Sequence, residues 1–197
     1  MARQIIKLTC SKKYGGGYRG EESIFDGFRH DDLILAFFPC TRFEAQINLA
    51  FRGEQYQMKK YSDLQKLEYS MKLHKELHRN YEAISEMAHI GIERNLKMVI
   101  ENPFTPPHYL TMYWPLKPAV VDRNRMDNGD YMKKPTQYWF INMEPKNNIL
   151  MEPIKYIEPR NVERLKNTEE KKRQILRSEI HPQYASRFIR QFLLESE

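Results

Sequence analysis

Two short, nearly uninterrupted apolar runs stand out in an otherwise mixed pattern of hydrophobic and polar residues. Residues 32–38 read Asp-Leu-Ile-Leu-Ala-Phe-Phe, and residues 96–100 read Leu-Lys-Met-Val-Ile. Apolar runs of this length are typical of strands that are buried on both faces of a parallel sheet. We therefore predict buried strands at 32–38 and 96–100.

The stretch between these runs has the periodicity of a helix. Ser62-Asp63-Leu64-Gln65 matches a capping box, the pattern that starts a helix. Apolar residues recur behind it at helical spacing: Leu64, Leu67, Met71, Leu77, Tyr81, Ile84 and Met87. A helix or helix pair from 62 to 95 is long enough to cross between two parallel strands, so the region predicts a βαβ unit.

The rest of the chain predicts further strands and one clear terminal helix. We expect a short strand at 5–8, a short helix around 43–51, strands at 109–114, 119–123 and 137–142, and a turn at 127–130. Trp114 and Trp139 are expected to pack in the core or at a sheet edge and not to serve as platforms on which bases stack. Pro182 opens a helix, and the apolar residues after it follow helical spacing: Ala185, Phe188, Ile189, Phe192 and Leu193.

The amino-acid composition indicates the class of protein, the number of domains and the cellular setting. The 197 residues are 41% hydrophobic and 29% charged, which is typical of a globular, soluble protein and not of a disordered one. We expect one domain over 1–197, with an irregular basic segment at 1–30 and a basic segment at 152–197 that ends in a helix. Without a membrane-length apolar run or a signal peptide, and with two cysteines, we expect a cytoplasmic protein with reduced thiols and no membrane partner.

The net charge of +6 is uneven. Between Lys155 and Arg190, ten Lys and Arg residues stand against five Glu residues, which leaves +5 on one stretch. Such a stretch suits a phosphate backbone, but a solvated helix or a flexible tail has the same composition. The candidate nucleic-acid contacts within it are Lys171, Lys172, Arg173 and Arg177.

The candidate chemistry lies where the two predicted strands end. Pro39-Cys40-Thr41 follows the first, and Glu101-Asn102-Pro103 follows the second. Ligands bind at the carboxyl ends of parallel strands, and a thiolate paired with an acid can attack and protonate an aromatic ring. In the alternative reading, Cys40 is an ordinary buried cysteine, and Glu101 caps a turn or pairs with a lysine.

Four features in this order resemble the catalytic and C-terminal part of the DNA cytosine-5 methyltransferases, especially the compact forms of bacteriophages and mobile elements. They are the strand ending at Pro39-Cys40-Thr41, the strand ending at Glu101-Asn102-Pro103, the Lys-Pro-Thr segment within 132–139, and the Arg-Ser-Glu-Ile-His-Pro segment at 177–182. The match in order and spacing runs from about residue 25 to 194. It implies a reduced Rossmann-type methyltransferase-like α/β sheet flanked by helices.

The resemblance also implies a mechanism and its residues. Cys40 would add to C6 of a cytosine that has been flipped out of duplex DNA, and Glu101 would hold and protonate N3 of that base. Pro39, Asn102 and Pro103 would shape the base pocket. The methyl donor would be S-adenosylmethionine.

The same resemblance assigns an Arg-x-Arg element to residues 123–125. Arg123 and Arg125 would contact the base and a phosphate. Val121 stands where the family has a glutamine before this element, and plain surface arginines are the alternative.

The chain departs from the family where the methyl donor is bound. No Phe-x-Gly-x-Gly pattern precedes residue 32, the glycine-rich loop at 12–20 lacks the spacing of a dinucleotide fingerprint, and Phe37-Phe38 stands before Pro39. Enzymatic activity is therefore left open. The chain is either one subunit of a split enzyme with a partner protein, a catalytically impaired pseudoenzyme, or a non-catalytic module that binds nucleic acid or a protein such as a host defence complex. A structural assembly subunit is a further alternative.

Overall fold

The computed structural model describes residues 5–9, 24–160 and 176–195. Their contacts divide the chain into two compact units. Residues 2–120 and 137–144 form the larger unit, and residues 121–136 and 145–197 form the smaller one. The single domain expected over 1–197 stays a prediction.

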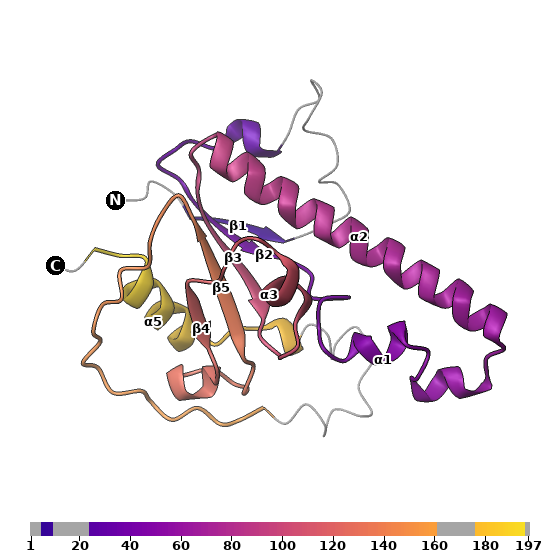
Figure 1. Ribbon diagram of the computed structural model, residues 1–197. Coiled ribbons are helices and arrows are strands. Elements are labelled where there is room, and N and C mark those ends of the chain that lie inside the picture. Colours follow the sequence, from indigo (N-terminus) through magenta and orange to yellow (C-terminus); the bar gives the residue numbers. More distant parts are fainter. Residues whose placement is uncertain (1–4, 10–23, 161–175, 196–197) are drawn as a thin grey trace. The chain divides into compact units, whose positions relative to one another are not determined.

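A mixed β-sheet with strand order β1-β2-β3-β5-β4 organises the fold (Figure 1). Its strands are β1 (Ile5–Thr9), β2 (Leu33–Phe37), β3 (Lys97–Pro103), β4 (Val120–Asp122) and β5 (Thr136–Ile141). The strands β1, β2 and β3 are parallel to one another. The α/β class and the strands predicted near 5–8, 32–38, 96–100, 119–123 and 137–142 are confirmed.

The long helix α2 (Asp63–Glu93) connects β2 to β3 and completes the predicted βαβ unit. Ser62 caps it as the sequence indicates: the Gln65 amide donates to Ser62 Oγ at 3.3 Å, and the Ser62 amide donates to Gln65 Oε1 at 2.9 Å. Phe37 and Glu101 are partners in the register of β2 and β3. The two predicted strands are therefore direct neighbours with the same direction.

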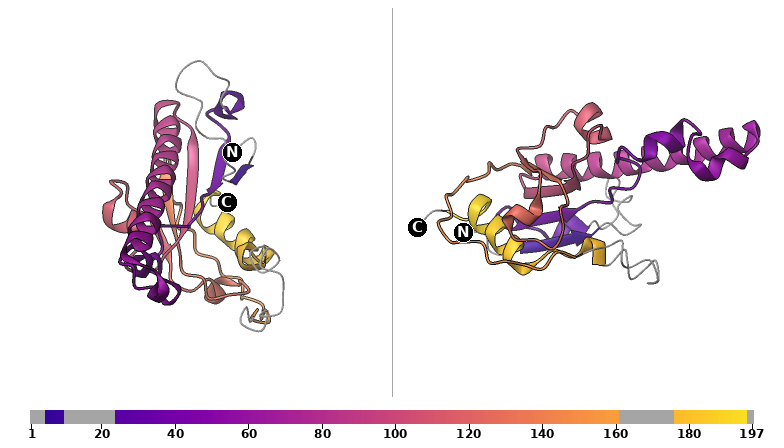
Figure 2. Two further views of the ribbon diagram at one scale, coloured as in Figure 1. Left: turned by 90° about the vertical axis from the view of Figure 1, so that its right-hand side faces the viewer. Right: turned by 90° about the horizontal axis from the view of Figure 1, so that it is seen from below.

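The core of the larger unit forms where the second half of α2 packs on one face of the sheet (Figure 2). The helix contributes Leu77, Ile84, Met87 and Ala88, and the strands contribute Ile34, Ala36, Met98 and Ile100. Ile84 is fully buried, and complete burial of such a side chain stabilises the fold by about 1.5–3 kcal/mol. Because side chains alternate along a strand, Val99 and Glu101 lie on the opposite face of the sheet.

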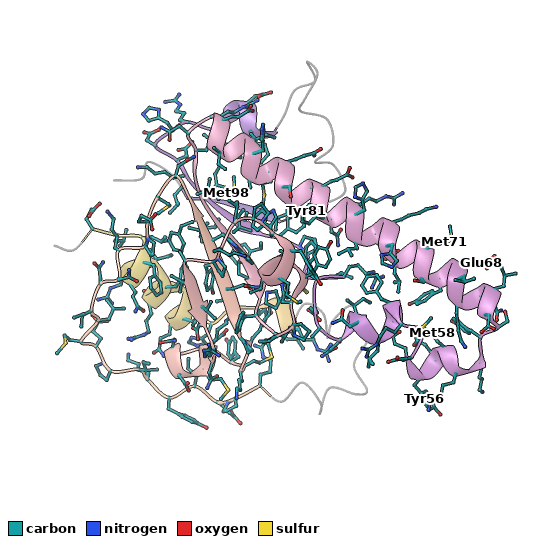
Figure 3. All side chains as sticks on the ribbon, in the orientation of Figure 1. Tyr56, Met58, Glu68, Met71, Tyr81 and Met98 are labelled. Atoms are coloured by element: carbon teal, nitrogen blue, oxygen red, sulfur yellow. The ribbon has the colours of Figure 1, made fainter. Side chains whose placement is uncertain are left out.

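The first half of α2 extends beyond the sheet. Its 31 residues span about 46 Å, whereas the seven residues of β3 span about 23 Å. The short helices α1 (Ile47–Phe51) and η2 (Tyr56–Lys60) lie along this extension (Figure 3). The side chains of Leu64, Leu67 and Met71 remain exposed there, so these positions of the helical pattern do not reach the core.

One predicted strand is a helix. Residues 109–114 form α3 (Tyr109–Tyr113), in which Leu110 and Trp114 are buried while Met112 and Tyr113 are exposed. This spacing of buried residues is helical, and the Trp114 amide donates to the Leu110 carbonyl at 3.0 Å. The strand prediction is wrong because it rested on the β-propensity of aromatic residues and threonine, which packing overrides.

In the smaller unit, the terminal helix and the turn before β5 are confirmed. Helix α5 (Pro182–Phe192) begins with His181 as its cap, whose Nδ1 accepts from the Gln183 amide at 3.0 Å. The helical turn η3 (Arg125–Asn128) ends at Gly129, whose φ of 89° lies in the left-handed region that favours glycine. A further short helix, η1 (Ile24–Gly27), precedes β2 in the larger unit. Within the described residues, no helix combines the length and apolarity needed to cross a bilayer.

Candidate functional site

The carboxyl ends of β2 and β3 bring Cys40 and Glu101 to the same edge of the sheet. Cys40 follows the last residue of β2 by three positions and is half-buried, as is Pro39. Glu101 is part of β3, which continues to Pro103, and both residues are buried. Glu101 is only 7% exposed, which is uncommon because charged side chains are almost never fully buried unless they are paired. That the two side chains face one pocket stays a prediction.

Asn102 connects the two segments. Its side chain is fully buried, and Nδ2 donates to the carbonyl of Phe38 at 3.1 Å. Phe38 immediately precedes Pro39 and packs in the core against Phe43. The Glu101-Asn102-Pro103 segment therefore fixes the backbone position from which the loop with Cys40 begins.

The loop that carries Cys40 is also anchored on α2. Arg42 has a φ of 82°, a left-handed conformation that is strained for a residue other than glycine. Its Nε donates to Glu76 Oε2 at 2.6 Å, and Asn80 Nδ2 donates to the Thr41 carbonyl at 2.6 Å. Backbone strain held by the surrounding structure is often found at functional sites.

Backbone hydrogen bonds also hold the turn formed by residues 40–43. The Phe43 amide donates to the Cys40 carbonyl at 2.9 Å, and the Phe43 carbonyl accepts from the Tyr109 amide at 2.9 Å. The backbone on both sides of Cys40 is thus held by hydrogen bonds to other elements.

A network of buried hydrogen bonds holds the backbone carbonyl of Pro103. Gln137, the first residue after the Lys-Pro-Thr segment, is fully buried in β5. Its Nε2 donates to the Pro103 carbonyl at 2.9 Å and lies 3.2 Å from His108 Nδ1, and its Oε1 accepts from the Thr111 hydroxyl at 2.8 Å. A carbonyl can only accept, so the orientation of the Gln137 amide is fixed, and Nδ1 of His108 is an acceptor.

His108 is therefore a neutral imidazole with its hydrogen on Nε2. Its side chain is 1% exposed, and burial lowers the pKa of His108 from 6.5 to about 4. Sequence reasoning missed His108 and Gln137. The position of Gln137 directly after Lys134-Pro135-Thr136 was the one signal that pointed to it.

In the part of the chain that the structure describes, three buried polar atoms without hydrogen-bond partners lie on one segment, and others lie on Arg125 and Arg187 in the smaller unit. Among the described residues, Asn102 Oδ1, Thr105 Oγ1 and His108 Nε2 have no hydrogen-bond partner. Each such atom costs about 1–3 kcal/mol, and native proteins keep few of them. Segment 102–108 thus carries polar groups that the fold leaves unsatisfied, as expected of a site that receives a ligand.

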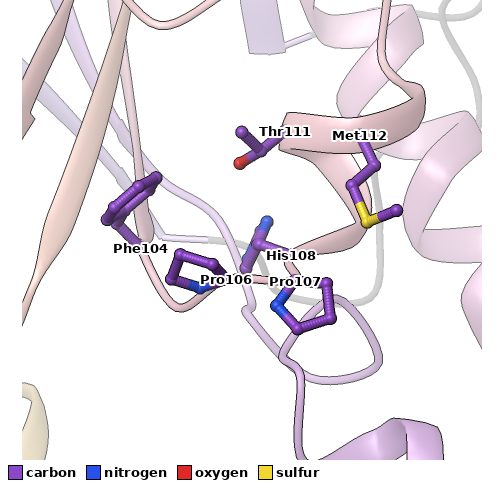
Figure 4. A pocket seen from close by; sticks show the side chains of 6 residues that line it. All are labelled: Phe104, Pro106, Pro107, His108, Thr111 and Met112. Atoms are coloured by element: carbon purple, nitrogen blue, oxygen red, sulfur yellow. The ribbon is translucent and has the colours of Figure 1, made fainter.

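A pocket is formed in part by this segment (Figure 4). It has a volume of about 420 Å³. Its lining comes from the loop after β3 and from α3: Phe104, Pro106, Pro107, His108, Thr111 and Met112.

The Arg-x-Arg element lies in the smaller unit and is split between surface and core. Arg123 is exposed, whereas Arg125 is 1% exposed and forms an ion pair with buried Asp130. The guanidinium of Arg125 also lies 4.6 Å from the ring centre of Tyr184. Reading Arg125 as a surface arginine is therefore wrong, because it is buried, forms an ion pair with Asp130 and stacks on the ring of Tyr184 within the smaller unit.

Most of the basic residues predicted to contact nucleic acid are not among the residues that the structure describes. Lys171, Lys172 and Arg173 lie outside the described residues. Arg177 is exposed within the helical turn at 176–178. The described residues hold no group of three or more His, Cys, Asp or Glu side chains arranged to bind a metal ion.

Comparisons with known proteins identified no relative of this chain. No protein-family model matches the chain, and searches of curated proteins and of solved structures found no match.

Proposed function

We propose that the chain is a DNA cytosine-5 methyltransferase-like protein on a Rossmann-type sheet, in which Cys40 and Glu101 act on a cytosine taken out of the duplex. The observation that carries the proposal is the parallel pairing of β2 and β3. It brings the Cys40 loop and Glu101 to one sheet edge, where Asn102 bonds to the Phe38 carbonyl. Three parallel strands in sequential order correspond to one half of a doubly wound sheet.

The chemistry of the two side chains follows from the electronics of the base. The Cys40 thiolate forms a bond from Sγ to C6 of cytosine, and the electron pair of the C5–C6 double bond moves into the ring. Glu101 donates a proton to N3, which neutralises the ring as it becomes electron-rich. The adduct is then nucleophilic at C5. With no methyl donor, C5 takes a proton from water and then carries two hydrogens. Loss of one of them from C5, departure of the thiolate from C6 and return of the N3 proton to Glu101 restore the aromatic base.

The methyl donor, S-adenosylmethionine, does not fit the described residues. The pocket beside His108 is almost wholly apolar, and none of its described lining residues has an acidic side chain to accept hydrogen bonds from a ribose. The segment that follows β1 lies outside the described residues. The step available to Cys40 and Glu101 themselves is exchange of the C5 hydrogen with water, through protonation and deprotonation of the adduct at C5.

This exchange gives a test that needs no donor. Mixed-sequence duplex DNA carrying tritium at C5 of cytosine is incubated with the protein, and the release of tritium into water is measured. We expect release by the native chain and a loss of about 100-fold or more in Cys40→Ser and Glu101→Gln, the range of nucleophilic and general acid contributions. Equal release by Cys40→Ser, or no release above a protein-free control, contradicts the proposal.

A non-catalytic DNA-binding module on the same scaffold is the second candidate, favoured by the net charge of +6. It predicts that replacing Lys171, Lys172 and Arg173 with glutamine abolishes DNA binding while Cys40→Ser leaves it unchanged. The logarithm of the affinity should fall linearly with the logarithm of the salt concentration. Tritium release by the native chain would rule this candidate out.

A further inference from the structure

The pocket beside His108 has the character of a site for a neutral ring. Figure 4 shows Phe104, Pro106 and Pro107 around His108, with Thr111 and Met112 above them on α3. Ligand pockets are about 300–1,000 Å³, and this one, at about 420 Å³, suits a small ligand. Among the described residues, its lining holds no acidic side chain, lysine or arginine. Phosphates and carboxylates would find no charge partner within it.

The polar group that His108 brings to the lining of this pocket is a buried hydrogen-bond donor. The bonds of Gln137 fix His108 with a hydrogen on Nε2, and this donor has no partner among the residues that the structure describes. An apolar pocket with a few convergent polar groups and a histidine of shifted pKa is the usual form of a small-ligand site.

We propose that this pocket binds a single unstacked nucleobase, whose ring packs on the proline and phenylalanine side chains and whose ring acceptor receives the Nε2 hydrogen of His108. Nucleobases are neutral, planar and rich in acceptors, and they stack well on such side chains. A phenylalanine or leucine of a partner protein has no acceptor to offer His108. Met112, whose side chain is 53% exposed and unbranched, forms the adaptable wall that lets the ring edge approach the imidazole.

The base could belong to a free nucleoside or to a nucleic-acid strand, because both present the same ring and the same hydrogen-bond acceptors. The first lining residue, Phe104, directly follows Pro103, the last residue of the strand β3 that contains Glu101. Assigning the base to the strand that carries the target cytosine rests on the proposed function, whereas nucleobase binding itself does not.

The test measures binding of the four deoxynucleosides by saturation-transfer NMR, with toluene as an apolar probe and inorganic phosphate as a charged one. Met112→Trp fills the pocket from an exposed position. Met71→Trp makes the same exchange at an exposed position of α2 outside the pocket and is the matched control. His108→Asn keeps an acceptor toward Gln137 and removes the Nε2 donor.

We expect at least one nucleoside to bind at millimolar concentration, Met112→Trp and His108→Asn to weaken it at least tenfold, and Met71→Trp to leave it unchanged. No nucleoside binding, equal binding to Met112→Trp, or tighter binding of toluene than of any nucleoside overturns the proposal. Cys40→Ser separates the two ideas, because it should abolish tritium release and leave nucleoside binding intact. A single-stranded oligonucleotide that binds more tightly than its nucleosides, and loses this advantage in Met112→Trp, assigns the base to a strand.

Discussion

The buried imidazole of His108 should make the fold sensitive to mild acid. Its folded-state pKa is about 4, while an unfolded histidine has a pKa of 6.5. Between these values the unfolded chain binds a proton that the folded chain does not, so stability falls as the pH drops from 6.5 to 4. The difference of 2.5 units at 1.36 kcal/mol each corresponds to about 3 kcal/mol, fully present above pH 6.5 and lost near pH 4.

Urea unfolding at a series of pH values from 7 to 4 measures this loss, with His108→Asn as the comparison. All other titrating groups are common to both proteins, so the stability advantage of the native chain over His108→Asn should shrink by about 3 kcal/mol across this range. His78→Asn is the control, because His78 is exposed and its pair with Glu82 contributes about 0.5 kcal/mol or less. Parallel stability curves for the native chain and His108→Asn would refute the reasoning.

Three further substitutions test other parts of the structure. Ser62→Ala removes the α2 cap and should lower the free energy of unfolding by about 1 kcal/mol, measured by urea denaturation. Asp130→Asn leaves buried Arg125 without its ion-pair partner and should cost about 3–5 kcal/mol, seen as a lower melting temperature. Asn102→Ala removes the bond to the Phe38 carbonyl. It should cost about 1–3 kcal/mol and reduce tritium release further than the stability loss explains, and release at the native rate would contradict a positioning role.

The elements that the sequence predicted are those whose determinants are local. The capping box at Ser62 and the apolar runs before Cys40 and Glu101 depend on neighbours in the chain, and the structure confirms them. The helix at 109–113 could not be predicted in this way, because burial of Leu110 and Trp114 on one side decides it. Arg125 is the same case: its burial depends on Tyr184, 59 positions later (184 minus 125).

The residues that hold the Cys40 loop could not be predicted from the sequence, because they are distant from it along the chain. Nothing in the Pro39-Cys40-Thr41 motif specifies that Arg42 adopts a left-handed φ. That conformation is held by Glu76, and the Thr41 carbonyl is held by Asn80, both on α2. Because α2 runs past the edge of the sheet, it has side chains in reach of the loop as well as of the core. The same helix that completes the βαβ unit therefore fixes the backbone beside Cys40, and substitutions at Glu76 or Asn80 should disturb this loop while the core face of α2 stays intact.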